Sequence, residues 1–468
     1  MRRLSGIALF LLMIFAVISL PAQPVAGQFV TNTPNGGASS NSDDASSRAT
    51  DPPAQSGGFA TNTPDGPTFT PSPSPSNTAT PTSTATNTAT PTATFTPSNT
   101  PSPTPTPNGP FSYPEGVNPL TGLPYPDQAA IERRNLIVKI SNYPPVVRPQ
   151  HGVNQADIVY EYEAEGGVTR FAAIYRSNNP DRVGSVRSAR LIDIELATMY
   201  NALLAYSGTS EPIQELLTTE PFFNFQLISP SVGHGESQNN NCEETVFCRN
   251  DDLLGRGVPR EHTLFGNTNL MWDIATRQGT NTGRIAFGFA FSEDETLNGE
   301  GSPANDVEIA WFGQTDGRWQ YDAETERYVR FTDGVPHLDA ADGEQLWADN
   351  LVIIEVPHVE RPDLFPPGAN YASLGIELFG QGRAYVIRDG NVYQGFWRRN
   401  ENLAEGQALQ LIYGDNTPIL LQPGRTWVTV VRGLGNALIS EELTDISATA
   451  TVIAQTPSPT PLDLNTDD

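Results

Sequence analysis

The sequence predicts an α+β protein, with a mixed N-terminal domain followed by a β-rich C-terminal domain. Residues 148–208 read as two paired strands, a third short strand, an arginine-bearing turn and a helix. From about residue 284 onward, alternating aromatic-rich runs separated by turn residues dominate, and segments with helical periodicity are nearly absent. Before residue 111 the chain is rich in Thr, Pro and Ser and has almost nothing to bury, which predicts a disordered N-terminal stalk.

The first 27 residues have the organisation of a secretory signal peptide. Arg2 and Arg3 precede an apolar run over residues 7–20, and a proline and small residues follow. The run is short for a membrane span, so residues 1–27 are a signal peptide or, if uncleaved, an N-terminal anchor. No cysteine lies directly after the run, which excludes a lipid-modified N-terminus. We therefore expect an extracytoplasmic protein, secreted or tethered to the membrane only through this segment.

Residues 28–110 form a low-complexity linker in which TNTP occurs at residues 31–34 and again at residues 61–64, followed by a run rich in Thr, Pro and Ser. Repeated prolines block helix formation, and the segment has too few apolar residues for a core, so we expect it to be disordered and extended. At ~3.1 Å per residue, a fully polyproline-like linker would reach on the order of 200 Å. It would hold the folded part away from the membrane, and its Thr and Ser residues permit O-glycosylation. Residues 436–468 return to this composition and are expected to form a disordered tail.

The N-terminal domain, expected over residues 111–283, is built around a β-hairpin. Residues 158–163 alternate between apolar and other side chains, as a strand with two different faces does. The Gly-Gly pair at 166–167 supplies the positive φ angles of a two-residue hairpin turn. After the arginine-bearing turn, a helix is expected from Ser188, its N-cap, to Tyr206.

The C-terminal domain is expected over residues 284–435 and consists mainly of strands. Runs such as RWQYD, NLVIIEV and TWVTVV are rich in β-branched and aromatic residues. Asp389-Gly390, between two alternating runs, predicts a tight hairpin turn. Five of the six tryptophans lie in this domain, and we assign most of them to its core rather than to an exposed sugar-stacking surface.

The formal net charge of -26 limits the kinds of partner that the protein can bind. So acidic a chain repels nucleic acid and anionic lipid over most of its surface, so we expect no nucleic-acid partner and no membrane contact beyond the N-terminal segment. The basic residues are almost all arginine, with Lys139 as the single lysine. Arginine suits the binding of carboxylate or phosphate, although codon bias also explains such a ratio.

The chain contains two cysteines, Cys242 and Cys248. In an exported protein, a pair this close in sequence predicts a local disulfide. A zinc site needs more ligands than two thiols, and no second pair exists. The five histidines show neither HExxH nor i, i+4 spacing, so the sequence predicts no metal and no cofactor.

Five arginines fall between residues 170 and 190, with Asp181 as the one acid among them. A two-residue turn at the Gly-Gly pair would place Glu163 opposite Arg170 and Asp157 opposite Arg176. Such cross-strand ion pairs contribute a few tenths to ~1 kcal/mol each. We therefore assign these two arginines a structural role.

Arg182, Arg187 and Arg190 have no acidic partner of this kind. Arg187 and Arg190 flank Ser188, the expected start of the helix, where unpaired N–H groups and the helix dipole favour an anion. Two guanidinium groups there would form a phosphate or carboxylate site. The alternative is that they form ion pairs with acids of the helix or of another loop. Ser210, in the loop that opens the next helix, would either line the same site or cap that helix.

Four motifs carry a resemblance to a known family. They are RPQHG (148–152), ADIVYE (156–161), EGGVTRF (165–171) and VGSVRSAR (183–190). Together they resemble the YerB-like family of exported bacterial proteins, over roughly residues 118–432. The resemblance implies an N-terminal and a C-terminal part of unknown function and no established activity. Members are typically lipoproteins, and this chain departs from them there. The resemblance also places a histidine after the arginine-containing loop near Arg249, which adds His262 to the candidate ligand-binding residues.

The function that these observations favour is the binding of an anionic or glycan ligand at the cell envelope. No catalytic signature occurs in the sequence, and Ser210 lacks the Gly-x-Ser-x-Gly context of a nucleophile elbow. One alternative is an envelope phosphotransferase, by analogy with the LytR-CpsA-Psr phosphotransferases, in which strand-borne arginines hold a lipid pyrophosphate. The other alternative is a purely structural module that docks another protein.

Overall fold

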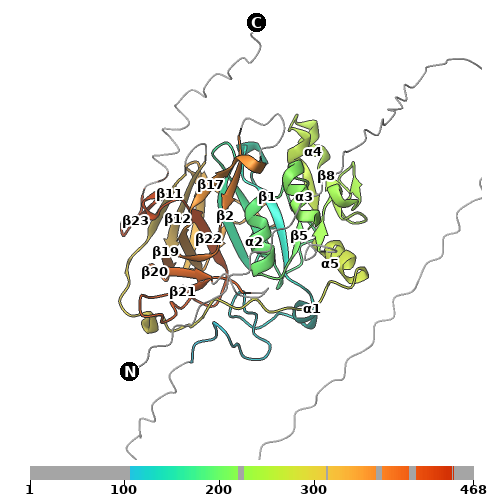
Figure 1. Ribbon diagram of the computed structural model, residues 1–468. Helices are drawn as coiled ribbons and strands as arrows, with labels where there is room; N and C mark the ends of the chain where they lie inside the picture. The colour runs from blue at the N-terminus through green and yellow to red at the C-terminus, as the bar shows by residue number, and fades with distance from the viewer. Residues whose placement is uncertain are drawn as a thin grey trace, which may run out of the picture. The chain divides into compact units, whose positions relative to one another are not determined.

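The computed structural model describes residues 106–219, 226–311, 315–364, 371–399, 407–444 and 446. The predicted signal segment and almost all of the predicted stalk lie outside the described residues, as do residues 447–468 of the predicted tail. The described chain is mixed and strand-rich with few helices, which is consistent with the predicted α+β class (Figure 1).

A sheet of eleven strands forms the centre of the described chain. Its order is β10-β20-β19-β16-β22-β2-β3-β1-β5-β6, with β21 beside β20. β22 pairs in parallel with both β2 and β16, so strands from the two expected domains share one sheet. The strands of this sheet are β1 Leu136–Ser141, β2 Ile158–Ala164, β3 Val168–Tyr175, β5 Leu203–Ala205, β6 Leu227–Ile228, β10 Ser302–Pro303, β16 Asn350–Glu355, β19 Gly380–Arg388, β20 Asn391–Arg399, β21 Gln410–Ile412 and β22 Thr426–Val431.

Both faces of this sheet are covered, because successive side chains of a strand point to opposite sides. On one face, Tyr160 and Val428 belong to a core that includes residues of α2 and α3. On the other face, Val159 and Trp427 belong to a second core that includes Trp319 of the smaller sheet. Strands buried on both faces read as nearly continuous apolar runs, as LIVKI and TWVTVV do.

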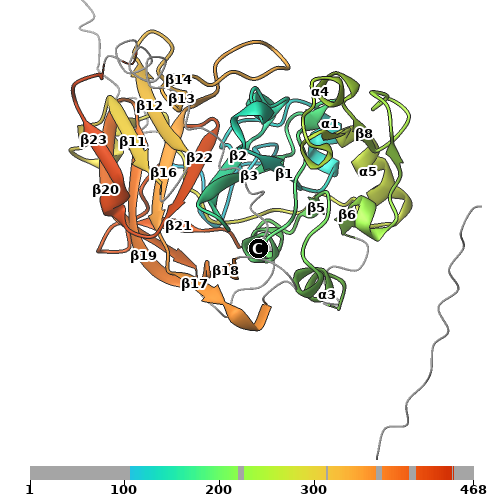
Figure 2. The ribbon, with the colours of Figure 1, turned by 90° about the horizontal axis from the view of Figure 1, so that it is seen from above.

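Smaller sheets and α-helices flank the large sheet (Figure 2). Within the described residues there are three such sheets and five α-helices. The six-stranded sheet comprises β11 Asp306–Ala310, β12 Asp316–Asp322, β13 Arg327–Thr332, β14 Val335–Pro336, β15 Trp347–Ala348 and β23 Ala437–Ser440. The four-stranded sheet comprises β4 Val183–Gly184, β7 Glu236–Ser237, β8 Phe247–Arg249 and β9 Leu264–Gly266, and the two-stranded sheet β17 His358–Arg361 and β18 Ser373–Ile376. The helices are α1 Gln128–Glu132, α2 Leu191–Met199, α3 Glu211–Thr219, α4 Asp251–Gly255 and α5 Thr268–Arg277. β23 lies inside the segment that composition assigned to the tail, and its pairing with β11 orders it.

The predicted helix over residues 188–206 is wrong at both ends. α2 begins after Arg190, its N-cap residue, whose main-chain N–H donates to the carboxylate of Asp193 (2.6 Å). It ends at Met199, and Asn201 then adopts a φ of 47° that turns the chain into β5. Asparagine tolerates this left-handed conformation better than most residues, which explains why the helix stops within an apolar stretch.

The hairpin of β2 and β3 is present, but its turn contains three residues rather than two. Ala164 pairs with Val168, which leaves Glu165, Gly166 and Gly167 between the strands. Both glycines have positive φ angles, of 82° and 68°. The predicted glycine turn is therefore confirmed in its chemistry, whereas its predicted length, and with it the register of the hairpin, is wrong by one residue.

Two other local predictions are confirmed. Asp389 and Gly390 have positive φ angles and connect β19 to β20, with Arg388 paired to Asn391 across the turn. The second is the disulfide, since Cys242 and Cys248 are bonded, with their Cα atoms 5.0 Å apart.

We expect the variant that carries Cys242→Ala and Cys248→Ala to lose about 2 kcal/mol in its free energy of unfolding, because the bridge closes a short loop and restricts the unfolded chain. Urea unfolding of both proteins at pH 7 measures the loss. Reductant should destabilise the wild-type protein by a similar amount and leave the double variant unchanged. A difference below ~0.5 kcal/mol, within the range of ordinary surface substitutions, would contradict the expectation.

Candidate functional site

The segment that links β4 to α2 is held by main-chain hydrogen bonds on two sides. The N–H of Arg187 donates to the carbonyl of Lys139 in β1 (2.9 Å), and the carbonyl of Arg187 accepts from Ser207 after β5 (3.0 Å). The N–H of Val186 donates to the carbonyl of Leu264 in β9 (2.6 Å). The sheet and the β9 region therefore fix the backbone that carries the predicted arginines.

Three arginines gather at this segment: Arg170 of β3, Arg187 and Arg190, which together we name the arginine cluster. Burial lowers the pKa of Arg170 to about 9, and the charges of Arg190 and Arg187 contribute to this shift. Burial, followed by the charge of Arg190, also lowers the pKa of Arg187. Arg170 is 6% exposed, and among the described residues its guanidinium donates only to the carbonyls of Thr169 (3.0 Å) and Tyr143 (3.4 Å).

One carboxylate is paired within the arginine cluster. Glu165, from the hairpin turn, forms an ion pair with Arg190. Arg187 donates to the main-chain carbonyl of Glu261 (3.2 Å), and the nearby carboxylate of Glu261 only moderates the lowering of the pKa of Arg187. Three guanidinium groups with one paired carboxylate leave a formal surplus of positive charge in a chain that is acidic elsewhere.

Three polar atoms in this region are buried without a hydrogen-bond partner among the described residues: Nδ1 of His262, Oγ of Ser210 and Oγ of Ser185. Burial, and then the charge of Arg187, lowers the pKa of His262 to about 4, so its imidazole is neutral at pH 7. The hydroxyl of Thr209, next to Ser210, donates to the carbonyl of Ala189 (2.8 Å), which places Ser210 beside the cluster segment. Unpaired buried polar atoms are uncommon in native proteins, and each is available to a ligand.

The structure corrects the predicted capping role of Ser210. Its carbonyl accepts from the N–H of Gln214 (2.9 Å), while its hydroxyl forms no hydrogen bond to α3 in the described chain. Arg182, another predicted site residue, contacts other side chains than those of the arginine cluster. Its guanidinium donates to the side chain of Asn240 (2.8 Å) and lies over the ring of Phe265, 4.4 Å from the centroid.

The two cross-strand ion pairs predicted for the hairpin are not formed. With the three-residue turn, Arg170 lies opposite Tyr162, and Glu163 instead pairs with Arg432 (2.7 Å). Asp157 accepts a hydrogen bond from the main-chain N–H of Arg176 (2.6 Å), not from its side chain.

The guanidinium of Arg176 has a structural role of another kind. It donates to the main-chain carbonyls of Ala130 (3.0 Å) and Ile131 (2.7 Å), at α1. Sequence reasoning thus described Arg176 correctly as structural and missed Arg170 as a member of the cluster. Glu165 followed by two glycines is also compatible with a three-residue turn. Had that turn been assumed, the sequence would have predicted the observed register of the hairpin.

A buried ion pair of β1 and α2 lies beside the arginine cluster. Nζ of Lys139 is 3.0 Å from Oδ1 of Asp193, and both side chains are 0% exposed. The hydroxyl of Tyr162 donates to the same carboxylate oxygen (2.6 Å). Burial lowers the pKa of Lys139 to about 8. The charges of Arg190 and Arg170 add to this lowering, whereas the charge of Asp193 opposes it. Sequence reasoning missed this pair, although the one lysine among so many arginines was a visible signal.

Comparison with known proteins identifies the family of the chain. Residues 120–281 match the family described as "Protein of unknown function (DUF3048) N-terminal domain", and residues 307–428 match the corresponding C-terminal domain. The chain belongs to the YerB-like family. A relative, "Putative lipoprotein YerB" of Bacillus subtilis strain 168, is 28% identical over 332 residues, which are 69% of this chain and 88% of the relative. A crystal structure of the YerB protein from Bacillus subtilis has a TM-score of 0.56 and 26% identity, and covers 69% of this chain and 99% of that one.

The predicted membership of the YerB-like family is thus confirmed, and the family has no known function. The name of the Bacillus relative describes a lipoprotein. In the present chain, no helix among the described residues is both long enough and apolar enough to span a bilayer.

Proposed function

We propose that the protein binds an anionic ligand of the cell envelope through the arginine cluster. The observation that carries this proposal is the gathering of Arg170, Arg187 and Arg190 with only one paired carboxylate among the described residues, that of Glu165. Guanidinium groups present planar forks that match phosphate and carboxylate. Like charges held together in a partly buried site repel one another, and a bound anion relieves this repulsion.

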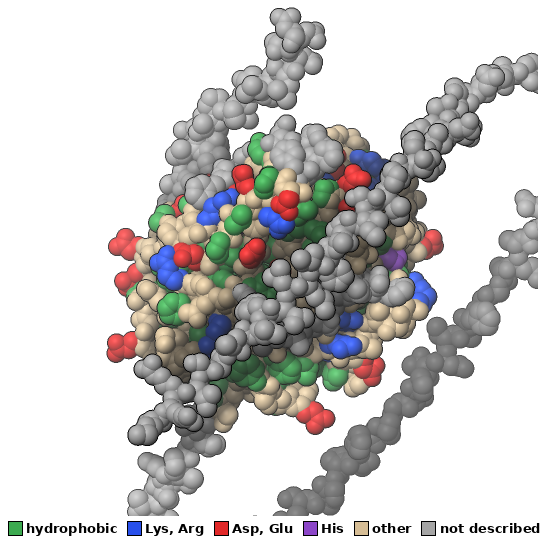
Figure 3. All heavy atoms as spheres, viewed as in Figure 1, with side chains coloured by type: hydrophobic (Ala, Val, Ile, Leu, Met, Phe, Trp, Pro, Cys, Tyr) green, Lys and Arg blue, Asp and Glu red, His purple; other side chains and the backbone are tan. Residues whose placement is uncertain are grey.

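The surroundings of the cluster support a ligand that carries hydroxyl groups as well. The unpaired atoms of His262 and Ser210 would form hydrogen bonds to oxygen atoms beside the anion. A phosphorylated or carboxylated glycan combines both kinds of group. On the face drawn in Figure 3, acidic and basic side chains are interspersed, so that face as a whole does not favour anions. The signal-like N-terminal segment and the name of the Bacillus relative support an extracytoplasmic location for this ligand.

The two alternative functions find less support in the cluster. A group of acidic metal ligands beside Arg187 would favour a phosphotransferase, and ion pairs of both Arg187 and Arg190 would favour a docking module. Among the described residues, no three His, Cys, Asp or Glu side chains gather as metal ligands, and Arg190 forms an ion pair whereas Arg187 forms none. Binding is therefore the function that the cluster supports best.

Phosphate or pyrophosphate should raise the Tm of the protein in a concentration-dependent way, because a ligand of the folded state stabilises it. At 100 times the Kd, the free energy of unfolding would rise by ~2.7 kcal/mol. Arg187→Gln should abolish this rise, since glutamine keeps a hydrogen-bonding group and removes the charge. Without an anion, the variant should be as stable as the wild-type protein or more so. Differential scanning fluorimetry at constant ionic strength measures both effects.

Arg383→Gln is the matched control for this experiment. Arg383 is 60% exposed and pairs with Glu355 in β16, so its loss removes one positive charge without touching the arginine cluster. The control should keep the full response to phosphate. If wild-type, Arg187→Gln and Arg383→Gln proteins respond alike, the anion acts as a general stabilising salt and the cluster is not a binding site.

A further inference from the structure

The turn between β2 and β3 places one carboxylate against the arginine cluster. Glu165 forms an ion pair with Nε of Arg190, and the two side chains are 17% and 22% exposed. Its charge also opposes the lowering of the pKa of Arg170, although burial and the neighbouring arginines hold that pKa at about 9. Glu165 therefore acts on two members of the cluster.

Arg190 does not depend on Glu165 for its position. Its Nη1 donates to the carbonyl of Ala189 (3.0 Å), and its main-chain N–H donates to the carboxylate of Asp193 (2.6 Å). Its other terminal nitrogen has no hydrogen-bond partner among the described residues. The guanidinium is thus held at the cluster, with donor groups for an incoming anion once Glu165 moves away.

The turn that carries Glu165 is suited to such a movement. The two residues that follow, Gly166 and Gly167, have φ angles of 82° and 68°. Glycine adopts positive and negative φ angles about equally well, so the turn changes conformation at a small cost in free energy. Glu165 is therefore able to leave Arg190 while the paired strands stay in place.

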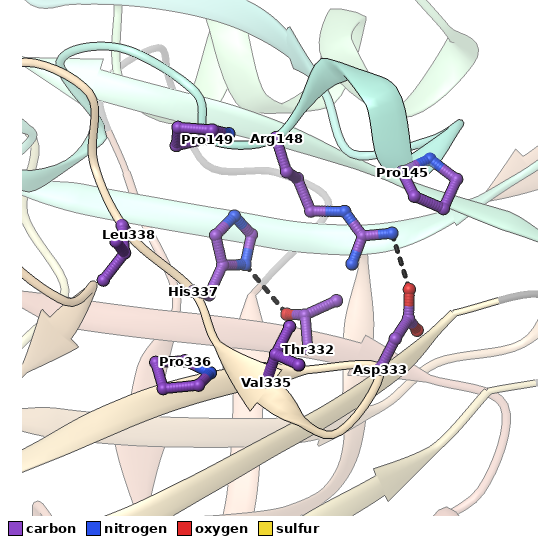
Figure 4. Close-up of a pocket in the computed structure, with 9 residues that line it drawn as sticks. All are labelled: Pro145, Arg148, Pro149, Thr332, Asp333, Val335, Pro336, His337 and Leu338. Atoms are coloured by element: carbon purple, nitrogen blue, oxygen red, sulfur yellow. Dashed lines mark hydrogen bonds and ion pairs between the residues drawn. The ribbon is translucent and has the colours of Figure 1, made fainter. Parts of the chain in front are cut away.

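Another ion pair of the chain provides a comparison. Arg148 and Asp333, which are 11% and 31% exposed, lie 2.6 Å apart at one end of a pocket of about 330 Å³ (Figure 4). The pocket lies between residues 145–149 and the β13–β14 hairpin, and most of its wall is apolar. In this pair one arginine has one carboxylate, whereas in the arginine cluster three arginines share that of Glu165.

We infer that Glu165 is an internal competitor of the ligand, whose carboxylate occupies Arg190 until a bound anion displaces it. This inference rests on the proposed function, since it requires an anion at the arginine cluster. Carboxylate and phosphate accept the same hydrogen bonds from a guanidinium group, so they exclude each other at one Nε. A tethered carboxylate has an effective concentration on the order of millimolar, which a dilute free carboxylate does not match. Glu165 therefore selects for a doubly charged phosphate group over a single carboxylate.

Isothermal titration calorimetry of the full chain with inorganic phosphate, at pH 7 and constant ionic strength, tests this inference. Glu165→Ala and Glu165→Gln should each lower the Kd about fivefold, which is the upper range for a partly exposed ion pair. Acetate should compete with phosphate in both variants but not in the wild-type protein, because the carboxylate position at Arg190 is then open. Asp333→Asn, which removes the carboxylate of the pair in Figure 4, is the matched control and should leave the Kd unchanged.

The possible outcomes separate this inference from the proposed function. If phosphate binds the wild-type protein and both Glu165 variants equally, or binds the variants more weakly, Glu165 is not a competitor, and the proposed function stands. A gain with Glu165→Gln but not with a folded Glu165→Ala variant would also overturn the inference, because the new amide would account for it. The same holds for an equal gain with Asp333→Asn, since any released arginine would then attract phosphate. Absence of phosphate binding to all of these proteins would refute the proposed function, and the inference with it.

Discussion

Replacing Glu161 by leucine should lower the free energy of unfolding by about 3–5 kcal/mol, because it leaves Arg330 buried and charged without its carboxylate. The two side chains are 1% and 0% exposed, and a guanidinium nitrogen of Arg330 lies 2.9 Å from Oε2 of Glu161. Trp427 donates its indole N–H to the same carboxylate (3.2 Å), and its ring centroid is 4.8 Å from the guanidinium carbon. The pair lies where the two sheets meet, so its loss would be felt in both halves of the chain.

Two comparisons make this prediction specific. The double variant Glu161→Leu with Arg330→Met should regain most of the loss, since an apolar pair of similar volume leaves no unpaired charge. Glu355→Gln, which removes the partner of the exposed Arg383, should cost less than ~1 kcal/mol. Urea unfolding followed by tryptophan fluorescence measures all three. A loss at Glu161→Leu no larger than that at Glu355→Gln would show that the buried pair is not needed for stability.

Lys139→Met should have an effect of similar size, about 3–5 kcal/mol, because the fully buried carboxylate of Asp193 would lose its counter-charge. The hydrogen bonds that Asp193 accepts from Tyr162 and from the N–H of Arg190 would remain and only partly compensate. Adding Asp193→Leu should restore part of the stability and remove the carboxylate that binds the N-terminus of α2. If Lys139→Met alone is neutral, Asp193 is already uncharged in the folded protein.

The pH dependence of stability separates the two members of this pair. The pKa of Lys139 falls from 10.5 in the unfolded chain to about 8 in the folded protein. Between these values the unfolded chain binds the additional proton, so the contribution of Lys139 to stability rises as the pH increases from about 8 to 10.5. Lys139→Met should lose this rise. It should also become most stable at acid pH, because burial raises the pKa of Asp193 and stability falls as that carboxyl ionises.

The sequence predicted the elements of the hairpin region better than their alignment. Alternation over residues 158–163 and the two glycines indicated the hairpin, yet whether Glu165 belongs to a strand or to the turn is not encoded in periodicity. That single residue decided whether Arg170 would face a carboxylate or Tyr162. The end of α2 was equally hidden, because the apolar residues after Met199 continue into β5 and suit either structure.

Contacts between distant parts of the chain left no local signal at all. Nothing near Glu161 in the sequence indicates that Arg330 will be its partner, and nothing near Lys139 indicates Asp193. Arg187 and Arg190 were found because their position before a helix is visible locally, and Arg170 joined them only through strand pairing. The sequence therefore predicted the site residues that lie in one turn, and it missed those that other strands and helices contribute to the site.

The place of β22 between β2 and β16 sets the order in which the molecule can be completed. The indole of Trp427 and the carboxylate of Glu161 are 266 residues apart along the chain, and until β22 arrives both neighbouring strands have an open edge. A chain that emerges from its N-terminus cannot close this sheet until almost all of the folded part is available, and sheets with such distant pairings form slowly. The first half of the chain cannot complete the sheet without β22, so it should remain unfolded for longer. This topology is therefore compatible with export of an unfolded chain through a membrane.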